Sequence, residues 1–335
     1  MLHYRDYNKY VSELLECKKI SGDRFCDVNQ IDRISFTPYV YNTCSANCAF
    51  CSEKLVRDGK VMACDTICED YEKHLQSVFR WLKNHQVFLS VSGKEPSESV
   101  EQVRLILDEA NKFEEAGGII TDRVMYTNLS GFAKRKEELF SCIEKGKISR
   151  IECSRHHFNE QINQSIVNFR PSESIKENKV FKNVVKELGG IVPVSMVCVM
   201  QKAGISTKEE VESYLEFAID AGVKAVVFRE LAMFDDAVED GCTTKYIVEN
   251  RVELMDIIKE LDEKTFTNLK VTKGYYYFSF DYKYKGMRVA FEMSDYEEMI
   301  KCHNDDSKLN KVILYPNGMV CKDWNMKGQI TIDEK

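Results

Sequence analysis

The sequence predicts an α/β protein, a partial (β/α)6, TIM-like barrel followed by a small C-terminal α+β extension. Short apolar stretches alternate with longer amphipathic stretches between residues 31 and 235. Six such units predict parallel strands joined by right-handed crossovers. After residue 236 the pattern changes to aromatic, alternating stretches separated by turn residues, which are typical of antiparallel strands.

Each predicted strand of the barrel is short and apolar, and a predicted helix follows it. Strands are expected near residues 33–37, 87–91, 123–127, 148–153, 192–199 and 225–228. Helices are expected near 70–84 and 98–116, then from strand three to about 145, from strand four to Gly189-Gly190, and over 206–222. Ser206 and Glu209 predict a capping box at the start of the last of these helices.

The pattern divides the chain into three regions. Residues 1–30 predict a leader helix, and residues 31–235 form the predicted core barrel. Residues 236–335 are expected to close the open side of the barrel. Within this last region we expect a helix near 247–262, a hairpin at Lys285-Gly286, and a strand pair around Pro316-Asn317-Gly318.

Composition excludes some classes of function. The 335-residue chain has a formal net charge of −7, which argues against binding a nucleic-acid duplex. No stretch is long and apolar enough for a membrane span, and no secretion signal is evident. Thirteen cysteines without such a signal indicate a reducing cytoplasm, where they are thiols or metal ligands.

The most informative stretch is the cysteine loop directly after the first predicted strand. Cys44, Cys48 and Cys51 have the spacing C-x3-C-x2-C, with Phe50 just before the last cysteine. A [4Fe–4S] cluster usually takes four cysteines, so three leave one iron open to an outside ligand. Two alternatives stay open: a zinc site with a fourth ligand such as Cys64 or Cys68, and buried structural thiols.

This motif resembles the signature of the radical S-adenosylmethionine (radical SAM) enzymes, and residues 225–233 resemble the GTP 3′,8-cyclase branch of that family. The resemblance implies a radical SAM barrel with a [4Fe–4S] cluster and S-adenosylmethionine as cofactors. It also implies cleavage of S-adenosylmethionine to a 5′-deoxyadenosyl radical, with electrons from an external reductant of the flavodoxin or ferredoxin type. In such barrels the chemistry lies at the C-terminal ends of the strands.

The resemblance extends to residues after the other strands and implies cofactor contacts for them. Gly93 and Glu95 match a G-G-E-P-like stretch, although Lys94 replaces its second glycine. Thr127 and Asn128 match a T-N-G stretch, although Leu129 replaces the glycine. The remaining expected cofactor-binding residues are Phe50, Ser154 and Arg229, and a buried Arg–Glu pair is the structural alternative for Arg229.

The substrate side is less defined. Arg155, His156 and His157 follow strand four and are candidates for binding substrate, and the histidines also for moving a proton. Cys302 and Cys321 are candidates for donating a hydrogen atom to a substrate radical. A second cluster is not expected there, because two thiolates are too few for a cubane.

The acidic composition and the short leader favour a small polar substrate, such as a sugar, nucleotide or phosphorylated metabolite. Cyclisation, dehydration, epimerisation and carbon–carbon bond formation all stay open as outcomes. One alternative is a radical SAM enzyme that modifies a peptide. Another, from a different class, is a non-catalytic protein that holds a metal or an iron–sulfur cluster.

Overall fold

The computed structural model describes part of the chain. The described residues are 11–13, 15–16, 18, 24–27, 33–41, 43–54, 66–231, 242–274, 276–305, 309–322, 324 and 328–332. Residues 11–13 and 15–16 are helical, as the leader prediction expects. Cys64 lies outside the described residues.

Six parallel strands form the core of the sheet, which confirms the predicted fold class. They are β2 (Arg33–Pro38), β3 (Gln86–Val91), β4 (Ile119–Thr127), β5 (Arg150–Ser154), β6 (Val194–Met200) and β7 (Ala225–Glu230), paired in that order. Their outward side chains are Val, Ile, Leu, Met, Phe and Cys, most of them fully buried under the helices. Burying each such side chain contributes about 1.5–3 kcal/mol, so this layer is the main source of stability.

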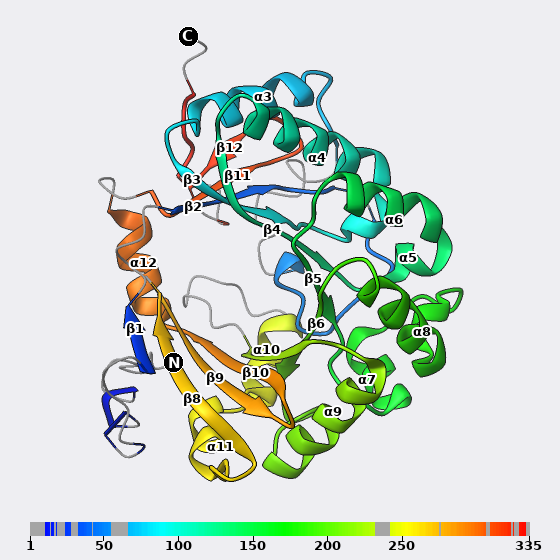
Figure 1. Cartoon of the computed structure of the whole chain (residues 1–335), viewed down its shortest axis with the longest axis vertical. Coiled ribbons are helices and arrows are strands. Elements are labelled where there is room, and N and C mark those ends of the chain that lie inside the picture. Colours follow the sequence, from blue (N-terminus) through cyan, green and yellow to red (C-terminus); the bar gives the residue numbers. More distant parts are fainter. Residues whose placement is uncertain are drawn as a thin grey trace.

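The helices cover the outer face of the curved sheet (Figure 1). They are α3 (Tyr71–Trp81), α4 (Val100–Glu115), α5 (Ser130–Lys134), α6 (Lys136–Lys145), α7 (Glu160–Val167), α8 (Asn178–Gly189) and α9 (Lys208–Ala221). In α3, for example, Leu75, Val78 and Phe79 recur at helical spacing and are buried, while the other face is polar.

Three helix predictions in the barrel were wrong in detail. The single helix expected after strand three is divided into α5 and α6 at Arg135, which caps both. The single helix expected after strand four is divided into α7 and α8, because Asn168 adopts a left-handed conformation (φ 51°) that ends α7. The capping box of α9 is one residue later than predicted. Thr207 accepts a hydrogen bond from the Glu210 N–H, and the Glu210 carboxylate accepts one from the Thr207 N–H.

The C-terminal region adds strands to both edges of the core. On one side β10 (Met287–Ser294) pairs parallel with β7, and β9 (Tyr277–Tyr284), β8 (Phe266–Lys273) and β1 (Phe25–Asp27) follow. On the other side β11 (Lys311–Leu314) pairs parallel with β2, and β12 (Val320–Cys321) follows. The strand β1 was not predicted. In Figure 1, α12 (Tyr296–Asn304) lies between the two ends of this sheet.

Turns of the C-terminal region largely agree with prediction. Tyr284 pairs with Met287 across Lys285-Gly286, both at positive φ, which confirms the hairpin. β11 and β12 are antiparallel and flank the predicted turn at Pro316-Asn317-Gly318. The one helix expected near 247–262 is divided into α10 (Cys242–Asn250) and α11 (Leu254–Glu260).

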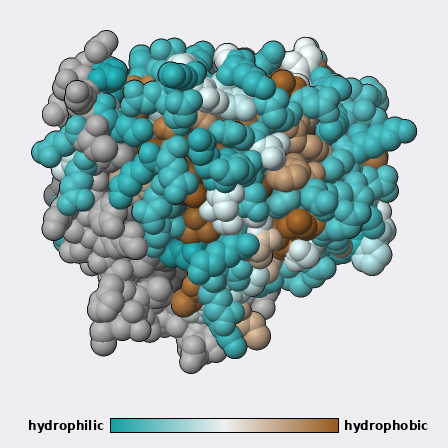
Figure 2. Space-filling model, turned by 90° about the horizontal axis from the view of Figure 1, so that it is seen from below, coloured by the Kyte–Doolittle hydropathy of each residue, from teal (hydrophilic) through white to brown (hydrophobic). Residues whose placement is uncertain are grey.

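The surface shows no broad apolar area on the face seen in Figure 2, where hydrophobic residues form small spots among hydrophilic ones. Exposed large hydrophobic side chains, such as Trp81, Ile119 and Val248, come from different elements. No helix within the described residues is long and apolar enough to cross a bilayer.

Candidate active site

The cysteine loop follows β2 and is held by backbone contacts to distant parts of the chain. Val40 bridges to Gly93 after β3, and Ala46 bridges to Phe169 after α7. The Asn47 N–H donates to the Val167 carbonyl at 3.1 Å, and the Arg170 guanidinium donates to the Cys44 carbonyl at 3.0 Å. The loop conformation is therefore determined by the barrel around it.

The three thiols of the loop lie near enough to influence one another. Burial raises the pKa of Cys44 to about 12, with smaller contributions from Glu95 and Cys51. Burial also raises the pKa of Cys48 to about 12, with contributions from Cys51 and Cys44. Burial and the neighbouring thiols both disfavour the thiolate form. A bound cation would offset these two effects and keep the three cysteines as thiolates.

The described residues offer no ready site for a single metal ion. Among them no three Cys, His, Asp or Glu side chains are close enough together to hold one ion, and these residues include Cys68. The zinc alternative therefore finds no support from Cys68. The ligands of a cubane bind different irons and stand farther apart than ligands around one ion. The assignment of Cys44, Cys48 and Cys51 to a [4Fe–4S] cluster is compatible with this result and stays a prediction.

Glu95 connects the three loops that follow β2, β3 and β4. Its carboxylate is 2% exposed and accepts hydrogen bonds from the Ser97 N–H at 3.0 Å, the Asn128 N–H at 2.7 Å and the Thr127 hydroxyl. Asn128 in turn donates to Ser45 at 3.0 Å, beside Cys44. We call Ser45, Glu95, Ser97, Thr127, Asn128 and Ser130 the loop cluster.

Burial raises the pKa of Glu95, and its hydrogen bonds partly offset that effect. No described cation pairs with Glu95, so its ionised form carries an unneutralised negative charge beside the cysteine loop. Both carboxylate oxygens already accept hydrogen bonds within the protein. The predicted contact between Glu95 and the ammonium group of the cofactor stays a prediction.

Two departures from the family motifs have clear structural settings. Gly93 has φ 141°, and a Cβ there would lie 2.3 Å from the Val40 carbonyl oxygen, so glycine is required at this position. Lys94 has no such constraint and donates its N–H to Val40. Leu129 has φ 67°, a conformation that glycine adopts easily, and its buried side chain compensates for the strain.

Arg155, His156 and His157 are buried and hydrogen-bonded within the protein. Arg155 donates to the carbonyls of Ile175 and Lys176, at 3.3 and 3.1 Å. The His156 Nδ1 accepts from the Val199 N–H at 3.0 Å, and the His157 Nδ1 accepts from the Asn159 N–H at 2.8 Å.

None of these three residues lines the barrel cavity. Burial lowers the pKa of His156 to about 3, and its ring stands edge-on to Phe50 of the cysteine loop, with the centroids 4.9 Å apart. His156 thus supports the cysteine loop. The predicted substrate roles gain no support from these positions. Ser154 ends β5 and is half-buried.

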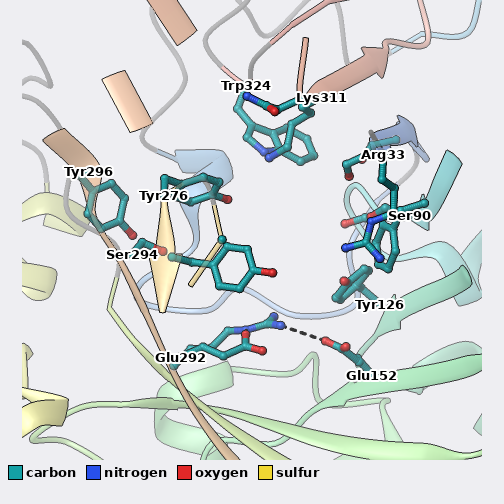
Figure 3. Close-up of a pocket in the computed structure, with 18 of the residues that line it drawn as sticks. Arg33, Ser90, Tyr126, Glu152, Tyr276, Glu292, Ser294, Tyr296, Lys311 and Trp324 are labelled. Carbon is teal, nitrogen blue, oxygen red and sulfur yellow. Dashed lines mark hydrogen bonds and ion pairs between the residues drawn. The ribbon is translucent and has the colours of Figure 1, made fainter. Parts of the chain in front are cut away.

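The barrel interior holds a cavity of about 580 Å³ (Figure 3). The lining side chains come from both halves of the sheet and include Tyr126, Tyr276 and Trp324. Ser92, after β3, and Glu230, at the end of β7, lie toward the same edge of the sheet as the cysteine loop. The cavity has the size of typical small-molecule sites, which range over about 300–1,000 Å³.

Six charged side chains inside the barrel form a series of ion pairs of alternating sign, which we call the charge chain. In spatial order they are Arg33, Asp122, Arg150, Glu152, Arg229 and Glu292, with closest distances of 3.9, 3.5, 3.1, 3.1 and 2.7 Å between successive members. Burial alone would lower the pKa of Arg229, but the carboxylates of Glu292 and Glu152 have the larger combined effect and raise it. The structure therefore shows the Arg–Glu alternative for Arg229, and its cofactor role stays a prediction.

The sequence did not predict the charge chain, because its members lie on β2, β4, β5, β7 and β10. A clue was the repeated charged or polar residue within otherwise apolar strands, such as Glu152 in Arg150–Ser154. An acid in the middle of a buried strand needs a partner, and the partner comes from strands far away in the sequence.

Cys302 and Cys321 occupy different environments. The Cys302 thiol on α12 lies 3.8 Å from a Glu298 carboxylate oxygen. Cys321 in β12 is fully buried against Tyr39, Ile313 and Tyr315. Neither lines the barrel cavity, so their predicted hydrogen-donor role stays without structural support.

No protein-family profile matches the sequence, and no curated protein matches it either. Solved structures do match. Streptococcus suis SuiB bound to S-adenosylmethionine has a TM-score of 0.55 at 14% identity, covering 100% of this chain and 71% of that one. SuiB bound to the precursor peptide SuiA gives 0.52 at 15% identity, covering 98% and 66%.

Escherichia coli coproporphyrinogen III oxidase (HemN), a radical SAM enzyme, gives a TM-score of 0.38 at 10% identity, covering 76% and 67% of the two chains. That likeness is too low to carry an argument. This chain spans 64–71% of the length of the SuiB chains. The similarity to SuiB shows that this chain and SuiB share a fold. It does not test the expected likeness to the GTP 3′,8-cyclase branch.

Proposed function

We propose that this chain is a radical SAM enzyme that acts on a small polar molecule held in the barrel cavity. One observation carries the proposal. A three-cysteine loop with no described fourth ligand follows β2 at the edge of a parallel barrel, in a fold shared with a protein that binds S-adenosylmethionine. Cys44, Cys48 and Cys51 would hold a [4Fe–4S] cluster at this edge.

When bound, the cluster and S-adenosylmethionine supply the one-electron chemistry that produces a 5′-deoxyadenosyl radical. The chain itself provides position and shielding. The loop cluster around Glu95 holds the loops after β2, β3 and β4 in one arrangement. Gly93, with no side chain, allows the backbone of Val40, just before the cysteine loop, to pack directly against it. Phe50, Thr127, Asn128 and Ser154 lie at the same edge of the sheet and would line the cofactor.

The cavity supports a small substrate. Its volume of about 580 Å³ suits a metabolite of the size of a sugar or nucleotide. Its lining is rich in charged, hydroxyl and aromatic groups, which suits a polar molecule. Hydrogen abstraction from such a molecule could lead to cyclisation, as in the GTP 3′,8-cyclase branch, or to dehydration, epimerisation or carbon–carbon bond formation. The proposal includes an external flavodoxin- or ferredoxin-type reductant and a reducing, cytoplasmic setting.

A second candidate is a peptide-modifying radical SAM enzyme. The observation that favours it is the similarity to SuiB, which has been crystallised with its precursor peptide SuiA. The two candidates differ in what reaches the cavity. A peptide-modifying enzyme would depend on a leader segment of its substrate, whereas a small metabolite would bind through the cavity alone.

Anaerobic reconstitution with iron and sulfide tests the proposed class. The chain should take up about four irons. It should form 5′-deoxyadenosine when reduced in the presence of S-adenosylmethionine. Cys48→Ala should abolish this product because one corner of the cluster loses its ligand. Cys242→Ala, which removes an exposed cysteine on α10, is the matched control and should retain it.

Two results would count against the class. One is uptake of zinc with exclusion of iron, which would support a non-catalytic metal protein. The other is equal 5′-deoxyadenosine formation by Cys48→Ala and the wild type.

A further inference from the structure

Among the described residues, the cations that line the barrel cavity are paired with carboxylates, with one exception. Arg33, Arg150 and Arg229 belong to the charge chain, in which three guanidinium groups face three carboxylates. Glu230, also on the cavity wall, pairs with Arg251 at 3.0 Å. Lys311 lines the same cavity, and no described carboxylate forms an ion pair with it.

The surroundings of Lys311 hold its ammonium group without neutralising it. Lys311 begins β11 and lies opposite Ser35 of β2. Its Nζ lies 5.3 Å from the centre of the Trp324 ring and 5.9 Å from that of Tyr276. In Figure 3, Lys311 and Trp324 lie together on one side of the cavity, across from Glu292. Aromatic faces attract a cation, but they leave its full positive charge in place.

A half-buried, unneutralised ammonium group favours an anion in the adjoining space. Since the charge chain carries no net charge, Lys311 gives this part of the cavity its positive potential. The flanking rings offer apolar faces to the molecule that bears the anion. The same arrangement would bind a neutral ligand without any gain from the charge.

We propose that Lys311 binds an anionic group, a phosphate or a carboxylate, of the molecule held in the cavity, with Tyr276 and Trp324 against the atoms next to that group. As an identification of the substrate class, this inference rests on the proposed function. The anion-binding site itself exists whether or not the chain cleaves S-adenosylmethionine.

Tryptophan fluorescence gives a direct test. The chain has two tryptophans, and Trp81 is an exposed residue at the end of α3. In a Trp81→Phe background, Trp324 is the sole reporter, next to Lys311. The reconstituted full chain is titrated anaerobically with phenyl phosphate, benzoate and neutral benzyl alcohol. We expect a saturable change with phenyl phosphate or benzoate, and the tighter of the two identifies phosphate or carboxylate as the preferred group.

Lys311→Met should weaken binding of the anionic probe by about tenfold or more, because the charged partner is lost. Lys285→Met is the matched control and should leave binding unchanged, since Lys285 is exposed and pairs with Glu216. Circular dichroism checks that each variant is folded. If Lys311→Met does not fold, the salt dependence of the wild type decides, since binding through Lys311 must weaken as ionic strength rises.

The proposal is overturned if benzyl alcohol binds as tightly as the anions, if Lys311→Met binds as tightly as the wild type, or if salt has no effect. These failures are distinct from failure of the proposed class. A chain that forms 5′-deoxyadenosine but binds no anion loses only this inference, whereas a chain that binds the anion but takes up no iron loses only the proposed chemistry.

Discussion

The loop cluster and the charge chain both bury carboxylates, and they satisfy them in opposite ways. Glu95 in the loop cluster accepts hydrogen bonds from N–H and hydroxyl groups and has no described cationic partner. Glu152 and Glu292 in the charge chain accept from the guanidinium of Arg229, at 3.1 and 2.7 Å. The first arrangement keeps a net negative charge, and the second cancels it.

This difference separates two tasks in the barrel. The charge of Glu95 reaches the cysteine loop, where it contributes to the raised pKa of Cys44 after the larger effect of burial. A cationic cofactor such as S-adenosylmethionine would be stabilised by that charge. The charge chain instead connects β5, β7 and β10 across the cavity. Because its charges cancel, it does not favour a ligand of either sign. Three substitutions can break or sharpen this contrast.

Among the substitutions of charged residues, Arg229→Met should have the largest effect on stability. It leaves Glu152, whose side chain is 5% exposed, and Glu292 without their shared cation. Removing one partner of a buried pair costs about 3–5 kcal/mol, and the partial exposure of Arg229 places the expected loss near the lower end. Urea unfolding measures it. Arg288→Met, on the same sheet but paired at the surface with Asp281, is the control and should cost less than about 1 kcal/mol.

Glu95→Gln should have a smaller effect on stability, about 2 kcal/mol, because an amide nitrogen would face either the Ser97 N–H or the Asn128 N–H. It should also weaken S-adenosylmethionine binding to the reconstituted chain by about tenfold, since the negative charge is lost. Glu101→Gln is the control, since Glu101 is an exposed residue that pairs with Arg135. Equal affinities in Glu95→Gln and the wild type would contradict the role given to this charge.

The pH dependence of the same pair of proteins has a defined sign. Burial raises the folded-state pKa of Glu95 above its ordinary value of 4.5. The folded state then holds its proton more tightly than the unfolded state, so the contribution of Glu95 is fully present below pH 4.5 and is lost as pH rises through the folded-state pKa. The stability of the wild type relative to Glu95→Gln should fall over that window. A constant or rising difference would be inconsistent with a raised pKa.

The smallest expected difference is between two substitutions of Leu129. Leu129→Ala and Leu129→Gly both remove a fully buried side chain, and each should cost about 2–4 kcal/mol. Because residue 129 has φ 67°, the glycine variant should be about 1 kcal/mol more stable than the alanine variant. At a residue with negative φ, the glycine variant would be the less stable of the two variants. If Leu129→Ala proves more stable than Leu129→Gly, the left-handed conformation at residue 129 carries no strain.

Local patterns predicted the barrel strands and the cysteine loop well. Strands such as Gln86–Val91 and Ala225–Glu230 are apolar runs ended by polar residues, and that information lies within a few positions. The position of Glu95 beside the loop was predicted from a motif. Its partners Ser97, Thr127 and Asn128 were not, because they depend on how two loops meet in space.

What could not be predicted depends on contacts between residues far apart in the sequence. Arg33 and Asp122 become partners only once β2, β3 and β4 are in register. The position of Lys311 in the cavity could not be predicted, because nothing in the sequence near residue 311 shows that β11 would pair with β2. The division of the helix at Asn168 depends on a backbone conformation that several residue types share.

The placement of β11 beside β2 has a consequence for assembly. Ribosomal synthesis delivers β2 and the cysteine loop early, yet the neighbour that completes this side of the sheet is made some 270 residues later, as the pairing of Ser35 with Lys311 shows. Such distant pairing forms slowly and only after most of the chain has collapsed. The nascent chain therefore has an incomplete sheet edge beside β2 until β11 has been made, and the sheet that supports the cysteine loop is completed only after most of the chain has been synthesised.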